Sequence, residues 1–255
     1  MTAVTKYQFE LPSEGAQIFW ALVDYSRWFV ATDAPFLERI LANNGRFDVP
    51  TLSSVLTKYD VARGFPAATS VKFGKLIDVL HHYANGWPDR MMDRCEHCIG
   101  LASSLKRKGL TQKLQVSAAT KTMWFLNPEG WTLFDKLAAD GMNAPAHLSA
   151  EKKAQYFYAH LESCCFEGLQ NRLFKLIQQS EWRDIPAARV FDFVLMNRSN
   201  SQSASVRKAD CTGYLNALPR SASDSLIALA RKAQNEFGND ILPPVTRKRR
   251  GRRTV

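Results

Sequence analysis

The chain has 255 residues, of which 45% are hydrophobic and 23% are charged, proportions that are ordinary for a globular protein. The length suffices for one large domain or two small ones. No apolar run is long enough to span a bilayer, and the first residues lack the charged and apolar segments of a secretory signal. We therefore expect a cytoplasmic protein with no membrane partner.

The net charge of +10 is unevenly distributed. Basic side chains attract polyanions because binding releases condensed counterions. Since no membrane signal accompanies them, we predict a nucleic-acid partner, although a basic tail can also serve solubility alone. The basic residues form one cluster in the body of the chain and one in the C-terminal tail: Lys106, Arg107, Lys108 and Lys113, then Arg247, Lys248, Arg249, Arg250, Arg252 and Arg253.

Hydrophobic residues recur at helical spacing along most of the chain. Alternating strand patterns, a glycine-rich dinucleotide fingerprint and a phosphate-binding loop are all missing, which excludes a doubly wound nucleotide fold. The sequence therefore predicts an all-α fold. Its apolar helix faces are Ile18, Phe19, Leu22 and Val23; Phe73, Leu76, Ile77 and Leu80; Ala154, Phe157, Tyr158, Leu161 and Cys165; and Leu173, Leu176 and Ile177.

Polar residues mark where several of these helices begin. Asp33 precedes Pro35, Ser149 precedes Glu151 and Asp184 precedes Pro186, so each is expected to cap a helix through its side chain. Glycine, proline and asparagine predict breaks at residues 64–67, 86–89 and 143–147.

The chain is expected to divide into three parts. We predict a helical domain over residues 1–197, a helical extension over residues 198–240 that includes a helix at 223–237, and a disordered basic tail over residues 241–255.

Five cysteines occur, an odd number that argues against a disulfide framework in a cytoplasmic chain. Cys95 and Cys98 have the spacing of a zinc knuckle. The second pair would have to be Cys164 and Cys165, and adjacent cysteines cannot easily share one tetrahedral ion. We predict no metal site and no cofactor, and interpret Cys95 and Cys98 as half-buried residues of a helix.

The most informative segment runs from Ser117 to Asp135. Small residues lead to Lys121, an apolar aromatic stretch follows, and residues 127–130 break the helix. A short hydrophobic link then ends at Asp135, which stands where a helix N-cap should be. We expect Lys121 to be half-buried, and burial against Trp124 and Phe125 would lower its pKa.

This order resembles the centre of the helix-hairpin-helix DNA glycosylases. In that family a catalytic lysine begins a helix after a hairpin, and a catalytic aspartate follows a proline-containing link and caps the next helix. The separation of 14 residues between Lys121 and Asp135 is similar to that of a compact bacterial group resembling 8-oxoguanine glycosylase. The resemblance extends over roughly residues 70–197, and its specific part is about twenty residues long.

The resemblance implies two helical lobes around a cleft and a chemistry for the pair. A neutral Lys121 amine can attack the sugar C1′ and form a Schiff base, while Asp135 stabilises positive charge on the sugar. The base must leave the stack for a pocket with aromatic walls, which we assign to Trp124, Phe125, Trp131 and Phe134. The implied function is excision of a modified base, with or without abasic-site cleavage, in repair or anti-phage defence.

One departure from the family concerns the hairpin. Residues 115–120 replace a glycine-containing hairpin whose backbone N–H groups approach a DNA phosphate. We expect Lys106, Arg107, Lys108 and Lys113 to make this contact instead, together with the tail residues Arg247, Lys248, Arg249 and Arg250.

Other interpretations stay open. Lys121 can be a surface lysine with a buried stem and Asp135 only a cap, in which case the protein is a non-catalytic DNA-binding module. It can also be an accessory protein of a repair or defence operon that acts through protein contacts. Elsewhere, Arg189 and Asp192 can form a salt bridge within one helix or reach the DNA, and their spacing favours the salt bridge. His81 with His82 can either end a helix or contact a phosphate.

Overall fold

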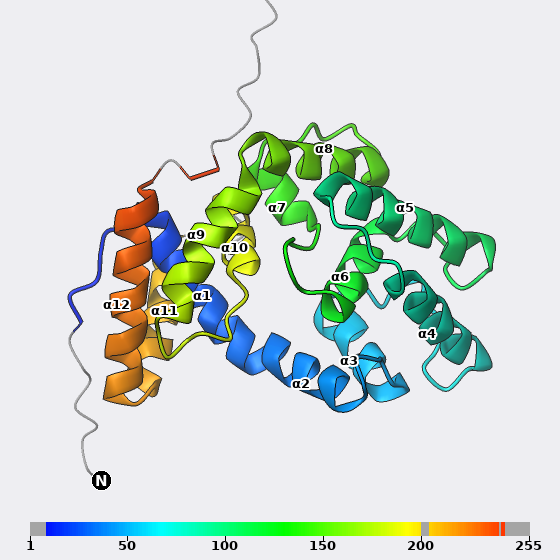
Figure 1. The fold of residues 1–255 in the computed structure, drawn as a ribbon, viewed down its shortest axis with the longest axis horizontal. Coiled ribbons are helices and arrows are strands. Elements are labelled where there is room, and N and C mark those ends of the chain that lie inside the picture. Colours follow the sequence, from blue (N-terminus) through cyan, green and yellow to red (C-terminus); the bar gives the residue numbers. More distant parts are fainter. Residues whose placement is uncertain (1–8, 200–203, 240, 243–255) are drawn as a thin grey trace, which may run out of the picture.

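The computed structural model describes residues 9–199, 204–239 and 241–242, and their regular structure is helical throughout, with no strand among them. The all-α prediction is therefore confirmed (Figure 1). The elements are α1 (Gln17–Trp28), a π-helical turn η1 (Phe29–Asp33), α2 (Ala34–Ala42), α3 (Val49–Lys58), α4 (Val71–Ala84), α5 (Met91–Arg107), α6 (Val116–Leu126), α7 (Lys136–Gly141), α8 (Ala150–Ser163), α9 (Phe166–Gln178), α10 (Ala187–Ser199), α11 (Ala204–Ala217) and α12 (Arg220–Phe237). Within these ranges no helix is long and apolar enough to cross a membrane.

The helices pack in two groups (Figure 1). The terminal group consists of α1, α7 and α9–α12, with α10 packed against both α1 and α7. The middle group consists of α2–α6 and α8, in which α5 and α6 lie against each other and against α8. One continuous hydrophobic core runs through both groups. The resemblance implies two lobes around a cleft, whereas these two groups of helices share one core.

The first and last helices of the chain share one part of this core. Helices α11 and α12 pack against α1, so the predicted C-terminal extension is folded onto the first helix. The sequence predicts a disordered tail from residue 241, but Ile241 and Leu242 are buried. The Arg198 guanidinium donates hydrogen bonds to their carbonyl oxygens. The basic residues from Arg247 onward lie outside the described residues.

Helix α1 continues into α2 through the π-helical turn without a break (Figure 1). This continuity makes the prediction of an Asp33 cap wrong, because the helical backbone runs through Asp33 into α2 and the Asp33 carboxylate makes no capping hydrogen bond. The prediction is confirmed at Ser149, whose hydroxyl accepts from the Lys152 N–H at 3.3 Å. The expected breaks at residues 64–67, 86–89 and 143–147 all fall between helices, and the expected helix at 223–237 lies within α12.

The cysteines are all free thiols. Cys95 and Cys98 lie on α5 and are fully buried, more deeply than the half-burial expected, and burial raises the pKa of the Cys95 thiol to about 12. Among the described residues no three His, Cys, Asp or Glu side chains gather as metal ligands would.

Helices α7 and α10 approach each other most closely at Gly141. A Cβ atom at this position would lie 2.1 Å from the Leu195 carbonyl oxygen, which is backbone and cannot swing aside. The glycine thus permits the packing that holds the short helix α7, and with it Asp135, against the terminal group.

We predict that Gly141→Ala lowers the free energy of unfolding by about 1–3 kcal/mol or more, because the two helices must move apart. Gly213→Ala is the matched control, since Gly213 is also helical and no atom lies within 4 Å of its added Cβ. That change should stabilise by up to about 1 kcal/mol through helix propensity. Urea denaturation of both variants measures the difference, and equal effects would contradict the close approach.

Candidate functional site

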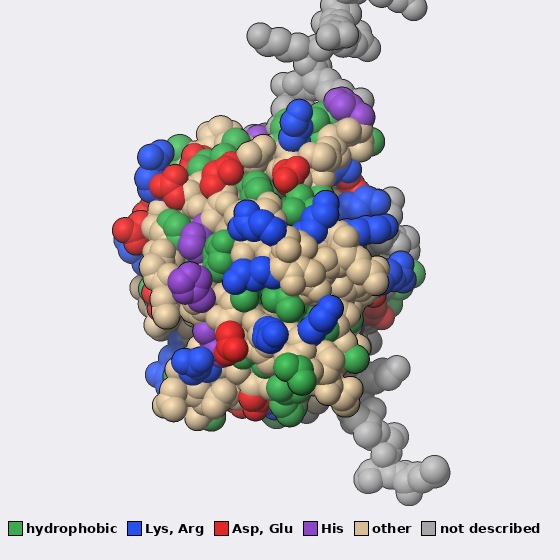
Figure 2. All heavy atoms as spheres, turned by 90° about the vertical axis from the view of Figure 1, so that its right-hand side faces the viewer, with side chains coloured by type: hydrophobic (Ala, Val, Ile, Leu, Met, Phe, Trp, Pro, Cys, Tyr) green, Lys and Arg blue, Asp and Glu red, His purple; other side chains and the backbone are tan. Residues whose placement is uncertain are grey.

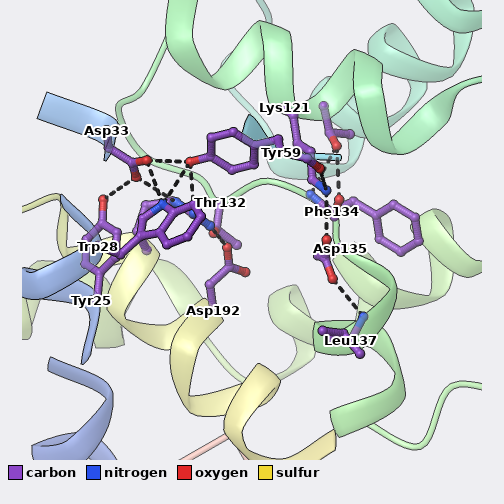
Figure 3. Close-up of polar contacts among 12 residues, drawn as sticks. Tyr25, Trp28, Asp33, Tyr59, Lys121, Thr132, Phe134, Asp135, Leu137 and Asp192 are labelled. Atoms are coloured by element: carbon purple, nitrogen blue, oxygen red, sulfur yellow. Dashed lines mark hydrogen bonds and ion pairs between the residues drawn. The ribbon is translucent and has the colours of Figure 1, made fainter. Parts of the chain in front are cut away.

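The structure brings Lys121 and Asp135 together (Figure 3). Lys121 lies in the second turn of α6, and its Nζ is 2.8 Å from Oδ2 of Asp135, the N-cap of α7. Since α6 belongs to the middle group and α7 to the terminal group, this ion pair joins the two groups of helices.

The Lys121 ammonium has two further neighbours, both from Tyr59. It donates to the Tyr59 carbonyl oxygen at 3.4 Å and lies 5.7 Å from the centre of the Tyr59 ring. Lys121 is only 5% exposed, so it is more deeply buried than the half-burial expected from the sequence. The ammonium is therefore held by a carboxylate, a carbonyl and an aromatic face.

Asp135 uses both of its carboxylate oxygens. While Oδ2 accepts from Lys121, Oδ1 accepts from the Leu137 N–H at 2.8 Å, which is the predicted N-cap bond. Burial raises the pKa of this carboxyl, but the Lys121 charge and the hydrogen bonds from Lys121 and Leu137 outweigh it and lower the pKa. Asp135 is thus ionised at neutral pH.

The small residues before Lys121 explain why Asp135 arrives beside it. The Phe134 N–H donates to the Thr120 hydroxyl at 3.2 Å, and the Ser117 hydroxyl donates to the Phe134 carbonyl at 3.3 Å. At the other end of the link, the Trp131 indole N–H donates to the Asn127 carbonyl at 2.6 Å. The link between α6 and α7 is therefore fastened along the first turns of α6, and its last residue stands beside Lys121.

The four rings assigned to a base pocket lie in the hydrophobic core instead. Trp124, Phe125, Trp131 and Phe134 are at most 4% exposed. Helix α6 is surrounded by packed elements, so nearly every residue from Val116 to Phe125 is buried. In this conformation the rings are not walls of an open pocket, and a flipped base would reach them only if the neighbouring helices moved.

A buried polar network that the sequence analysis missed lies beside the ion pair (Figure 3). The Asp33 carboxylate accepts from the Tyr59 hydroxyl at 2.5 Å, the Trp28 indole N–H at 2.9 Å and the Tyr25 hydroxyl at 3.0 Å. Tyr59 in turn accepts from Arg189 at 3.4 Å. Tyr59 therefore belongs to both clusters, with its hydroxyl in this network and its carbonyl on Lys121.

Arg189 is the cation of this network. It is 2% exposed, pairs with Asp192 three residues later, and its Nε lies 3.7 Å from the Asp33 carboxylate. The predicted salt bridge within α10 is thus confirmed, and it is buried. The guanidinium also lies 5.2 Å from the Trp124 ring centre. Arg189 is held by carboxylates and aromatic faces within the protein, which excludes it from DNA contact in this conformation.

The predicted basic cluster of the middle group is exposed. Lys106, Arg107, Lys108 and Lys113 occupy the end of α5 and the loop after it. This loop is fastened to the one after α3, because Gln112 N–H donates to the Gly64 carbonyl and the Gln115 amide to the Arg63 carbonyl at 2.8 Å. Arg63, also exposed, joins the cluster, and the loop after α3 contains Tyr59, which contacts Lys121. Figure 2 shows lysine and arginine side chains gathered on this side of the molecule.

His81 has a structural contact. Its Nε2 accepts from the Phe47 N–H at 2.9 Å and ties α4 to the loop before α3. Desolvation and the nearby Arg46 lower its pKa, so the ring is neutral at pH 7. This places His81 among the packed residues, away from the phosphate contact considered for it.

No protein-family model, curated protein sequence or solved structure matches the chain. The class that the fold and site define is therefore an all-helical protein with a lysine–aspartate pair between two groups of helices.

We predict that Tyr59→Phe lowers the free energy of unfolding by about 1–3 kcal/mol, because the buried Asp33 loses a donor. The ring and the carbonyl that contact Lys121 stay in place. Tyr156→Phe, a half-buried tyrosine of α8, is the control and should change stability by less than about 0.5 kcal/mol. Chemical denaturation compares the two, and a cost no larger at Tyr59 than at Tyr156 would refute the network.

A second prediction concerns pH. The folded-state pKa of Asp135 is lowered, so its contribution to stability is complete above the unfolded value of about 3.9 and is lost as pH falls through the folded value. The stability difference between the wild type and Asp135→Asn should be constant from pH 7 to about pH 5 and shrink on further acidification. Urea denaturation between pH 7 and pH 3 measures it. A difference that grows on acidification has the opposite sign and would rule out the ionised pair.

Proposed function

We propose that this protein is a DNA N-glycosylase that excises a modified base through Lys121 and Asp135, with abasic-site lyase activity. The observation that carries the proposal is the 2.8 Å contact between the Lys121 amine and the Asp135 carboxylate at the junction of the two helix groups. An amine and a carboxylate are a minimal set for breaking an N-glycosidic bond, since one attacks C1′ and the other supports the charge that develops there.

The chemical step uses the protonated amine of the resting pair. As the bond between C1′ and the base breaks, the base takes the electron pair and receives a proton from Lys121, and the amine nitrogen bonds to C1′. The charge of Lys121 is thereby transferred to the nitrogen–sugar adduct, beside the ionised Asp135. Opening of the sugar ring moves a second nitrogen proton to O4′ and leaves an iminium, which borohydride reduces to a stable link.

Substrate must separate the pair before this step. The Asp135 side chain keeps 20% of its surface exposed, against 7% for Lys121. The sugar therefore approaches from the Asp135 side and replaces the carboxylate next to the amine. The position of the pair between two groups of helices favours this, because a small movement between the groups changes the distance between Lys121 and Asp135.

The basic loops supply the means of holding DNA. Arg63 and the cluster at Lys106, Arg107, Lys108 and Lys113 are exposed on loops that are hydrogen-bonded to each other. Exposed lysine and arginine side chains bind the phosphate backbone without regard to sequence. These contacts would position a strand next to Tyr59 and hence next to Lys121.

One observation favours a second candidate function. Lys121 and Asp135 are in direct contact and largely buried, as is typical of an ion pair that only fastens two parts of a fold. The protein would then be a non-catalytic DNA-binding module, and the pair would link its two helix groups without doing chemistry.

Borohydride trapping on duplex DNA that carries an abasic site, or one of a panel of modified bases, separates the two functions. We expect the wild type to become covalently linked, Lys121→Gln to give no linked product, and Asp135→Asn to react about 100- to 1000-fold more slowly. Lys136→Gln is the control, since Lys136 is the exposed lysine next to Asp135.

Either single substitution leaves a buried partner unpaired and should cost about 3 kcal/mol of stability. The double variant Lys121→Gln/Asp135→Asn can restore a neutral hydrogen bond and recover part of that loss. If its fold and DNA binding recover while trapping stays absent, the chemistry belongs to the pair. A wild type that binds DNA and is never trapped would exclude the lyase chemistry and favour the non-catalytic module.

A further inference from the structure

An open surface cavity lies between α2 and α3, next to the π-helical turn. Its volume is about 490 Å³, and two thirds of its lining residues are polar. The rest of the lining is the apolar edge of η1 and α2. The polar residues are Thr32, Arg39, Ser53, Ser54, Thr57 and Lys58.

The charged side chains that line this cavity are both cations. Arg39 comes from α2 and Lys58 from the end of α3, and both are exposed. The carboxylate of Asp48, which interacts electrostatically with Arg39, is outside the lining and accepts the capping hydrogen bond of Thr51. The cavity therefore presents positive charge without a carboxylate in its wall, which favours an anion.

Three hydroxyl groups of the cavity lining have no partner in the described part of the chain and can therefore bind a ligand. Ser53 and Ser54 are half-buried, and neither hydroxyl has a hydrogen-bond partner within the described part of the chain. The Thr32 hydroxyl is buried and has no partner there either. Only Thr57 uses its hydroxyl, on the Ser53 carbonyl at 2.9 Å. Arginine, lysine and serine together are the side chains that bind phosphate oxygens in nucleic-acid complexes.

The cavity is adjacent in the chain to the candidate site. Thr32 precedes Asp33, and Lys58 precedes Tyr59, whose carbonyl contacts Lys121 at 3.4 Å. The Lys58 ammonium lies 5.3 Å from the ring of Trp28, which donates to Asp33. The wall of the cavity and the buried network are thus built from the same two short stretches of chain.

We infer that this cavity binds a phosphate group, and that its source is the DNA strand whose reacting nucleotide lies at Lys121. The inference that a phosphate binds here follows from the residues of the cavity. The inference that this phosphate belongs to DNA rests on the proposed function. None of the residues of the basic cluster lines the cavity, so the cavity would be a second phosphate contact beside that cluster.

The test is the salt dependence of binding to an abasic duplex. Arg39→Gln/Lys58→Gln should weaken binding and reduce the slope of log K against log salt by about 0.9 for each phosphate that the variant no longer neutralises. Lys175→Gln/Lys232→Gln removes the same charge from exposed positions of α9 and α12 and should leave the slope unchanged. Ser54→Glu places a negative charge in the cavity without touching either cation, and should weaken binding as well.

Titration with inorganic phosphate, followed by backbone amide NMR shifts at residues 53–58, separates the sources. A shallower slope in the variant together with phosphate-dependent shifts supports the inference. Shifts with an unchanged slope overturn the DNA source and leave a site for free phosphate. If the slope is unchanged and phosphate causes no shifts, the site is overturned altogether. Failure of wild-type trapping is a separate result, because it tests Lys121 and leaves the phosphate titration unaffected.

Discussion

The structure depends on the burial of Arg189 between two carboxylates. A buried guanidinium is costly unless its charge is paired, and the partners of this one come from three separate segments: Asp192 on its own helix, Asp33 in η1 and Tyr59 after α3. Those partners fix how the middle group lies against α10. Tyr59, once anchored by its hydroxyl, directs its carbonyl at Lys121. The position of the Tyr59 carbonyl at the candidate site thus depends on the buried charge of Arg189, which lies outside the site.

Local patterns in the sequence are sufficient to predict the helices and to single out Lys121 and Asp135 as a pair. Helical spacing, caps such as Ser149 and the break after α6 all depend on residues close in the chain. The Asp135 cap and the hydroxyls of Ser117 and Thr120 lie within the same short segment, which is why the contact to Lys121 was foreseeable from spacing. The all-helical fold was predictable for the same reason.

What could not be predicted depends on contacts between distant segments. The sequence favours a helix cap at Asp33 because proline follows two residues later. In the structure the helix continues, and the Asp33 carboxylate faces the buried network, where it accepts from Tyr59. The extra residue of a π-helical turn has no signature in the periodicity. The rings of Trp124 and Trp131 were taken for an open pocket because aromatic residues suit both a pocket and a core, and only packing distinguishes them. Arg63 joins the basic cluster because its carbonyl oxygen accepts from the Gln115 side-chain amide, a contact between distant segments that local sequence patterns do not indicate.

The uninterrupted run from α1 through η1 to α2 has a mechanical consequence. It behaves as one rod with an end in each group of helices, and its weakest point is the π-helical turn, where the hydrogen-bond pattern is irregular. The separation of Lys121 and Asp135 that the proposed chemistry requires would bend this run, and we expect the bend at the turn. Asp33 ends the turn, and its hydrogen bonds to Tyr25, Trp28 and Tyr59 tie α1 to the segment after α3.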